Sequence, residues 1–149
     1  MWRLTALCLL AFEPAAAFAD EGFSCGGADV RFAFEKRTDG GAFVESVVTV
    51  GQDDRETVLR YESAIDFIGG VCTEDGRGRP VVVFQAYCGG SGCYDLDNWG
   101  IVDPGDLRVL LVPNDWNRED AEKILGRPVP DIGRPISISD EARRLGLDW

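Results

Sequence analysis

The sequence predicts one mostly β domain, an antiparallel meander of about six strands that forms a sandwich or a small barrel, with one or two short C-terminal helices. Three observations support this fold class. Short runs rich in Val and Phe recur along the chain, clusters of Gly, Pro, Asn and Asp separate them, and helix-capping patterns follow near the C-terminus. An α+β arrangement of the same elements is the alternative.

The N-terminus has the pattern of a secretory signal peptide. Arg3 precedes an apolar run over Leu4–Phe12, and Ala17-Phe18-Ala19 matches the A-x-A pattern of a cleavage site. A glutamate interrupts the apolar run well before the about 20 residues that a membrane-spanning helix needs. We therefore expect residues 1–19 to be cleaved and residues 20–149 to form a single domain, exported to the periplasm or the extracellular space, with no membrane association after cleavage.

The first half of the domain predicts a hairpin and a third strand. Val30–Lys36 alternates apolar residues with polar or small ones, and Ala42–Val50 is rich in Phe and Val. The Asp-Gly-Gly turn signal between them predicts the hairpin. A polar turn at Gly51–Asp54 then leads to a shorter strand at Thr57–Tyr61.

The second half continues the meander. Ser63–Gly70 is expected to form one helical turn that the glycine pair ends. Val81–Cys88 is apolar on both faces through its first half, which is typical of a central strand. Trp99–Asp103 and Leu107–Val112 are predicted to be two further strands, because a Pro-Gly turn signature joins them.

Two short helices are predicted near the C-terminus. Asn117 occupies an N-cap position ahead of acidic residues, and Gly126 is placed to end that helix. Trp116 is expected to pack beside Asn117 as a hydrophobic staple. Three prolines make the following segment extended, and Ser139 is expected to cap a last helix that Gly146 ends.

Four cysteines follow the predicted signal, and an even number in an exported domain predicts two disulfides with three open pairings. The glycine-rich segment between Cys88 and Cys93 lets these two thiols meet, which leaves Cys25 to pair with Cys72. A zinc site and a redox pair are the alternatives. Both are disfavoured, because the chain has no histidine and no C-x-x-C spacing.

The charge of the chain restricts its partners. The net charge is −11, and the predicted signal contains one Arg and one Glu, so cleavage leaves this charge unchanged. Such an acidic protein is a poor match for nucleic acid or for anionic membranes. A protein partner, in particular a basic one, is the expected ligand, and a glycan is the alternative.

The absence of histidine excludes most nucleophilic mechanisms. Ser-His-Asp and Cys-His systems and histidine-ligated metal sites are all ruled out. We therefore expect a non-catalytic protein without a cofactor. A carboxylate-based glycan hydrolase is the alternative, because that chemistry needs only two well-placed acids, here Asp95 or Asp97 with a second one.

Candidate partner-binding residues gather between Gln85 and Trp99, where the sequence reads QAYCGGSGCYDLDNW. A disulfide-closed glycine loop would be preorganised for docking, and Tyr and Trp are frequent at interface hot spots. The alternative is a stapled β-turn with the tryptophan in the core. The predicted partner-binding residues are Ser91, Gly92, Tyr94, Asp95, Asp97, Asn98 and Trp99.

The same stretch allows two other ligands. Asp95, Asp97 and Asn98, with Asp103 or Asp106, offer oxygen atoms to Ca²⁺, as in a Ca²⁺-stabilised envelope module. The usual calcium loop, however, would require an oxygen ligand at the position where a tryptophan stands. Alternatively, Trp99 and Trp116 together would form a sugar-binding platform.

Gly90-Ser91-Gly92-Cys93-Tyr94 resembles the Ser-Gly-rich loop followed by Tyr in periplasmic lysozyme inhibitors, over five residues. The resemblance implies a small exported β-barrel protein that inserts this loop into the cleft of a cell-wall hydrolase. It implies that Ser91 and Tyr94 are the inserted residues. An acidic protein would also complement a basic, cleft-bearing enzyme.

Overall fold

The computed structural model describes residues 17–18, 22–36, 44–61, 65–90, 98–114 and 116–147. Within these residues the chain forms ten strands and two helices. The strands are β1 (Ala17–Phe18), β2 (Phe23–Cys25), β3 (Ala28–Lys36), β4 (Val44–Gln52), β5 (Arg55–Tyr61), β6 (Phe67–Glu74), β7 (Pro80–Tyr87), β8 (Trp99–Asp103), β9 (Arg108–Leu111) and β10 (Ile136–Ser137). The helices are α1 (Arg118–Leu125) and α2 (Ile138–Arg144).

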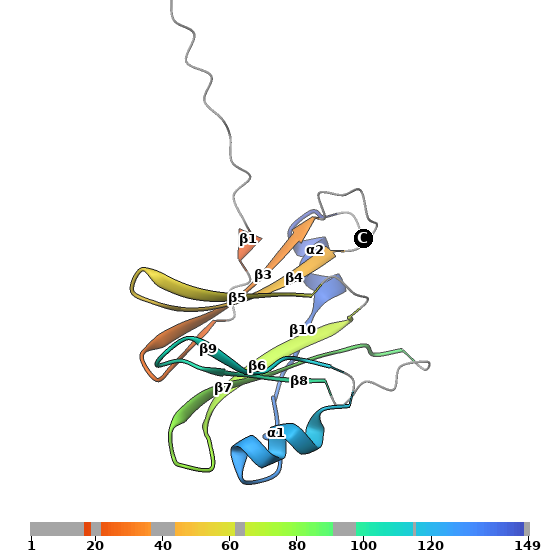
Figure 1. The fold of residues 1–149 in the computed structure, drawn as a ribbon. Coiled ribbons are helices and arrows are strands. Elements are labelled where there is room, and N and C mark those ends of the chain that lie inside the picture. The colour runs from red at the N-terminus through yellow and green to blue at the C-terminus, as the bar shows by residue number, and fades with distance from the viewer. Residues whose placement is uncertain are drawn as a thin grey trace, which may run out of the picture.

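The strands form two antiparallel sheets that face each other (Figure 1). Sheet A has the order β1-β3-β4-β5, with β2 also paired to β3, and sheet B has the order β10-β6-β7-β8-β9. This arrangement confirms the mostly β prediction and both halves of the meander. Over the described residues the two sheets stay separate, so the sandwich is observed and the barrel alternative is not.

The main core lies between the two sheets. The inward-facing side chains of β3 and β4 alternate mostly with polar outward-facing ones, as the predicted period of two requires; Ala33 and Val47 are apolar and buried on the outward face. Phe84 of β7 packs so closely on β8 that a Cβ at Gly100 would lie 2.2 Å from its ring. Tyr61 meets the same Phe84 edge-on, with ring centroids 6.3 Å apart, and burial raises the pKa of Tyr61.

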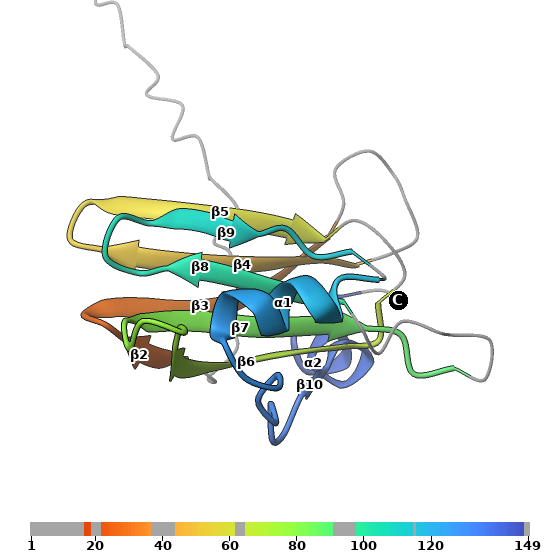
Figure 2. The same ribbon diagram turned by 60° about the horizontal axis from the view of Figure 1, so that its bottom comes forward.

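A second apolar cluster covers the outer face of sheet B. Helix α1 lies across this face (Figure 2), where Ala121 and Leu125 pack against Val81 and Val83 of β7. The prolines after α1 keep the chain extended as it returns along the same face, in agreement with the sequence. Strand β7 is therefore covered on both faces, which explains its continuous apolar run.

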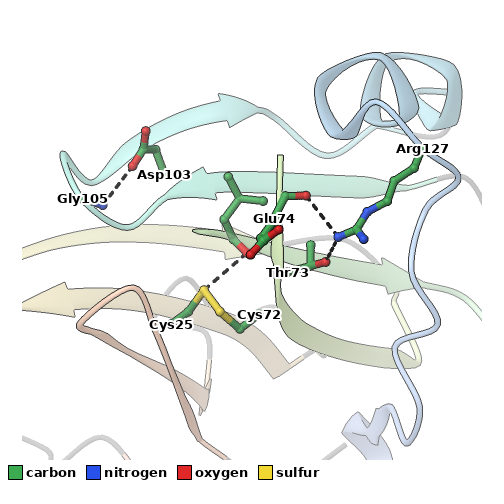
Figure 3. Close-up of a disulfide and its surroundings, with 8 residues drawn as sticks. Cys25, Cys72, Thr73, Glu74, Asp103, Gly105 and Arg127 are labelled. Carbon is green, nitrogen blue, oxygen red and sulfur yellow. Dashed lines mark hydrogen bonds between the residues drawn. A yellow bond between two sulfur atoms is a disulfide. The ribbon is translucent and has the colours of Figure 1, made fainter. Parts of the chain in front are cut away.

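The predicted disulfide between Cys25 and Cys72 is confirmed. It joins β2 of sheet A to β6 of sheet B, and it therefore ties the two layers together (Figure 3). The Cys25 sulfur lies 3.4 Å from the Val81 carbonyl oxygen, which is a contact without a proton because a disulfide sulfur carries none. Cys88 is disulfide-bonded as well, whereas Cys93 lies outside the described residues, so the pairing of these two remains a prediction.

The expected helical turn at Ser63–Gly70 is wrong, because β6 begins at Phe67 and runs through both glycines. These glycines are needed for close packing and not for stopping a helix. A Cβ at Gly69 would lie 2.6 Å from Ile132, and one at Gly70 would lie 3.3 Å from the Phe23 ring. No local pattern indicates these contacts, because Ile132 and Phe23 are distant in sequence.

Several predicted boundaries shift by one or two residues. The tight turn between β4 and β5 is confined to Asp53 and Asp54, and Asp53 adopts a positive φ of 56° that aspartate tolerates. The last helix begins earlier than expected. Its N-cap is Ser137 and not Ser139, because the Ser137 hydroxyl accepts a hydrogen bond from the Asp140 N–H.

Strand β1 falls within the predicted signal peptide. Its two residues pair with Phe34 and Ala33 at the edge of β3, while β2 pairs with the β3 edge nearer its start. Cleavage after Ala19 would remove β1 and leave β2 in place. The predicted domain of residues 20–149 thus keeps every strand of sheet B and all of the hydrophobic core side chains described between the sheets.

Candidate functional site

The connections of the sandwich differ between its two ends (Figure 2). Because the strands are antiparallel, successive connections alternate between these ends. We call the end with the short connections the turn end. Its connections are residues 26–27, 53–54, 75–79 and 104–107. We call the opposite end the loop end; its connections are residues 37–43, 62–66, 88–98 and 112–117, and it carries the predicted partner-binding stretch.

The start of the 88–98 connection is hydrogen-bonded to the segment that precedes β6. The Gly89 N–H donates to the Asp66 carboxylate at 2.7 Å, and the Asp66 N–H donates to the Tyr87 carbonyl at 2.9 Å. Phe67 stacks on Tyr87 and passes so close to Gly89 that a Cβ there would lie 2.4 Å from its ring. Glycine is therefore required at the start of this connection, next to the disulfide-bonded Cys88.

The end of the 88–98 connection is held by the side chain of Asn117, which is 1% exposed. The Asn117 amide accepts a hydrogen bond from the Trp99 N–H at 2.8 Å and donates to the carbonyl oxygens of Trp99 at 2.6 Å and Val112 at 3.0 Å. Asn117 is the N-cap residue of α1, as predicted, but its side chain makes no cap hydrogen bond to the helix. The pairing of β8 with β9 begins only at Ile101, so Trp99 has no partner on β9. The Asn117 amide bonds its backbone in place of a strand.

The predicted partner-binding residues divide into two groups. Asn98 and Trp99 are described, and Trp99 is 3% exposed, which places its ring in the outer cluster of sheet B as the structural alternative predicts. The Asn98 side-chain oxygen is buried and has no hydrogen-bond partner. The others lie outside the described residues; they are Ser91, Gly92, Tyr94, Asp95 and Asp97.

An exposed tryptophan stands at the loop end. Trp116 is 77% exposed, so the prediction of a hydrophobic staple beside Asn117 is wrong. Its backbone is held by a turn in which the Trp116 N–H donates to the Asn114 side-chain oxygen at 3.1 Å. Nearby Val112 is 64% exposed. Apolar side chains held out into solvent on a fixed backbone are typical of a contact surface.

A groove of about 390 Å³ lies on the outer face of sheet B near the loop end. Its floor comes from the ends of β7 and β8, one wall comes from the start of α1, and the other wall comes from the segment before β10. Sequence patterns alone do not reveal this site, because its residues come from four separate parts of the chain. They are Gln85, Tyr87, Trp99, Arg118, Val129, Pro130, Asp131, Ile132, Gly133 and Pro135.

Three polar features mark this groove. The Arg118 guanidinium lies over the Trp99 ring, 5.8 Å from its centroid, in a cation–π contact. The Trp99 indole Nε1 is buried without a hydrogen-bond partner. Asp131 uses one carboxylate oxygen to accept the Gly133 N–H at 2.8 Å, which shapes the turn in the outer wall.

The described acids do not converge on a cation. Asp103 and Asp106 lie at the turn end, where they accept the N–H groups of Gly105 and Arg108. Asn98 lies just before the opposite end of β8, about 16 Å from Asp103 if each strand residue advances by about 3.3 Å. Among the described residues, no group of three or more His, Cys, Asp or Glu side chains is arranged to hold a metal ion.

Neither described helix has the length and apolar character needed to cross a membrane. Comparison of the chain with known proteins finds no matching family model, no matching curated protein and no matching solved structure.

Proposed function

We propose that this protein is an exported, non-catalytic binding domain whose loop end docks with a partner protein. The observation that carries the proposal is an exposed aromatic side chain on a backbone held by hydrogen bonds. Asp66 bonds the start of the 88–98 connection, Asn117 bonds its end, and Trp116 is exposed beside Asn117. Binding residues on a preorganised support lose little conformational entropy on docking.

We further propose that the partner is a basic cell-wall hydrolase such as a lysozyme. The net charge of −11 favours a basic partner electrostatically. The resemblance of residues 90–94 to lysozyme-inhibitor loops supports the same class, with Ser91 and Tyr94 entering the cleft. The Cys25–Cys72 disulfide is consistent with an oxidising compartment outside the cytosol.

The test is the lysis of a cell-wall suspension by lysozymes of several types, with and without the oxidised domain of residues 20–149. We expect dose-dependent inhibition that is lost in a Ser91→Arg variant. Ser24→Arg is the matched control, because it makes the same substitution at an exposed position near the turn end. No inhibition of any lysozyme would overturn the partner class, and faster lysis would favour the carboxylate-based hydrolase instead.

A further inference from the structure

The groove on the outer face of sheet B has a chemistry of its own. Its lining combines rings and prolines with three planar polar side chains, which belong to Gln85, Arg118 and Asp131. We infer that this groove binds a neutral glycan, independently of the protein partner proposed above. The inference rests on charge balance, on the mixture of surfaces and on an unpartnered donor.

Charge balance favours a neutral ligand. The chain as a whole carries a net charge of −11, whereas the described residues that line the groove include one cationic side chain, Arg118, and one anionic side chain, Asp131. A multiply charged anion would meet Asp131. A cation would meet Arg118. A ligand without net charge avoids both penalties.

The mixture of surfaces favours a sugar over a purely apolar ligand. A pyranose ring has apolar C–H faces and a rim of hydroxyl groups that both donate and accept hydrogen bonds. The groove offers the corresponding pair of features, with Tyr87 and Pro130 among its apolar walls and a carboxylate, an amide and a guanidinium among its polar groups. Its volume of about 390 Å³ is at the small end for ligand sites and suits a short saccharide.

The buried indole of Trp99 supplies the independent observation. A buried N–H without an acceptor costs about 1–3 kcal/mol relative to a satisfied one, so native proteins rarely leave such a group unpaired. The Trp99 ring lines the groove, and its Nε1 lacks an acceptor within the protein. A sugar hydroxyl or acetamido oxygen would satisfy this N–H when ligand binding opens the buried edge of the ring to the groove.

The experiment titrates the oxidised domain with neutral trisaccharides, namely those of N-acetylglucosamine, glucose in β-1,4 linkage and glucose in α-1,4 linkage. The readout is the ¹H–¹⁵N resonance of the Trp99 indole, assigned with a Trp99→Phe variant. We expect at least one neutral trisaccharide to shift this resonance with a saturable dependence on concentration. Trimers of galacturonic acid and of glucosamine, which are anionic and cationic, should bind at least about tenfold more weakly.

The matched variants locate the site. Arg118→Met keeps an apolar chain over Trp99 but removes the guanidinium, and we expect it to weaken glycan binding at least about tenfold. Gln85→Met is the second variant, in case the first disturbs α1. Arg143→Met removes the same charge from the exposed face of α2 and should leave the affinity unchanged.

Three results would overturn the inference. They are the absence of any Trp99 shift up to about 10 mM neutral sugar, tighter binding of a charged trimer, and unchanged affinity in both groove variants. Because lysozyme inhibition is measured separately, failure of the glycan inference leaves the proposed partner untouched, and failure of the partner leaves the glycan inference untouched.

Discussion

The turn end and the loop end of this sandwich differ in what their polar and apolar groups do. At the turn end the polar groups are used within the fold. Asp75 accepts hydrogen bonds from the backbone N–H groups of Arg77 and Arg79 and from the Arg79 guanidinium, and Arg79 also approaches Asp103 at 3.8 Å. A Cβ on Gly26 would lie 2.8 Å from Pro104 and 3.0 Å from Pro80, so glycine is needed where these segments meet.

At the loop end the fold leaves groups unused. Trp116 and Val112 are exposed, the Trp99 indole and the Asn98 side-chain oxygen have no partner, and the groove lies alongside. One end of the sandwich therefore uses its polar groups to hold the fold together, while the other leaves groups without partners in the protein, as the proposed docking surface requires. Substitutions at the two ends should accordingly differ in their effects on stability and on binding.

Removal of the disulfide at the turn end should have the largest effect. The Cys25→Ala/Cys72→Ala variant removes a crosslink between residues 47 positions apart. The chain-entropy model predicts that this lowers the free energy of unfolding by about 4 kcal/mol. Urea denaturation followed by far-UV circular dichroism measures this loss. A loss below about 1 kcal/mol would show that the turn end does not depend on the staple.

Loss of the Asn117 amide should be the next largest effect and should come from the loop end. Asn117→Ala leaves the buried N–H and carbonyl of Trp99 without partners, for a cost of about 3 kcal/mol in urea unfolding. Asn114→Ala is the matched control, since this exposed side chain bonds one exposed backbone N–H. Equal costs for the two variants would contradict the role of Asn117 as a substitute strand partner.

The acid dependence of stability should follow Asp75. Hydrogen bonds from the Arg79 N–H, its guanidinium and the Arg77 N–H lower the pKa of Asp75 from 3.8 to about 2. Its stabilising contribution is therefore complete above about pH 4 and is lost as the pH falls toward 2. Asp75→Asn should be less stable than the unsubstituted protein at pH 7, and the difference should shrink across that range.

Thermal unfolding at steps between pH 7 and pH 2 measures this convergence. The control is Asp54→Asn, which removes a charge of the same sign from an exposed position at the same end. If the Asp75→Asn curve stays parallel to that of the unsubstituted protein down to pH 2, Asp75 does not provide the acid-sensitive contact.

Removal of the exposed indole should change stability least and binding most. We expect Trp116→Ala to shift the unfolding free energy by no more than about 0.5 kcal/mol, because the side chain is 77% exposed. If the loop end is the docking surface, the same variant should weaken hydrolase inhibition about tenfold or more. Unchanged inhibition with unchanged stability would remove Trp116 from the proposed surface.

Much of the fold was predictable from local patterns, and particular residues show where this ended. The alternation in β3 and the Pro-Gly turn before β9 gave six strands, since period and turn chemistry are local properties. The glycine pair in β6 was misinterpreted because its role is to admit Ile132 and Phe23, which are distant in sequence. The N-cap position of Asn117 follows from the local pattern, but its side chain bonds Trp99 instead of the helix, and Trp116 is exposed instead of packed beside it.

Hydrophobic periodicity, turn residues and cysteine count constrain the fold strongly, so the mostly β class, the meander and the Cys25–Cys72 pairing follow from local sequence. Which side chains meet depends on tertiary packing. Sheet packing brings separate segments onto one face of sheet B. It creates the groove lined by Gln85, Arg118 and Asp131, and it places the Asn117 amide against the backbone of Trp99. No local pattern encodes that meeting, since it depends on how two sheets and a helix pack.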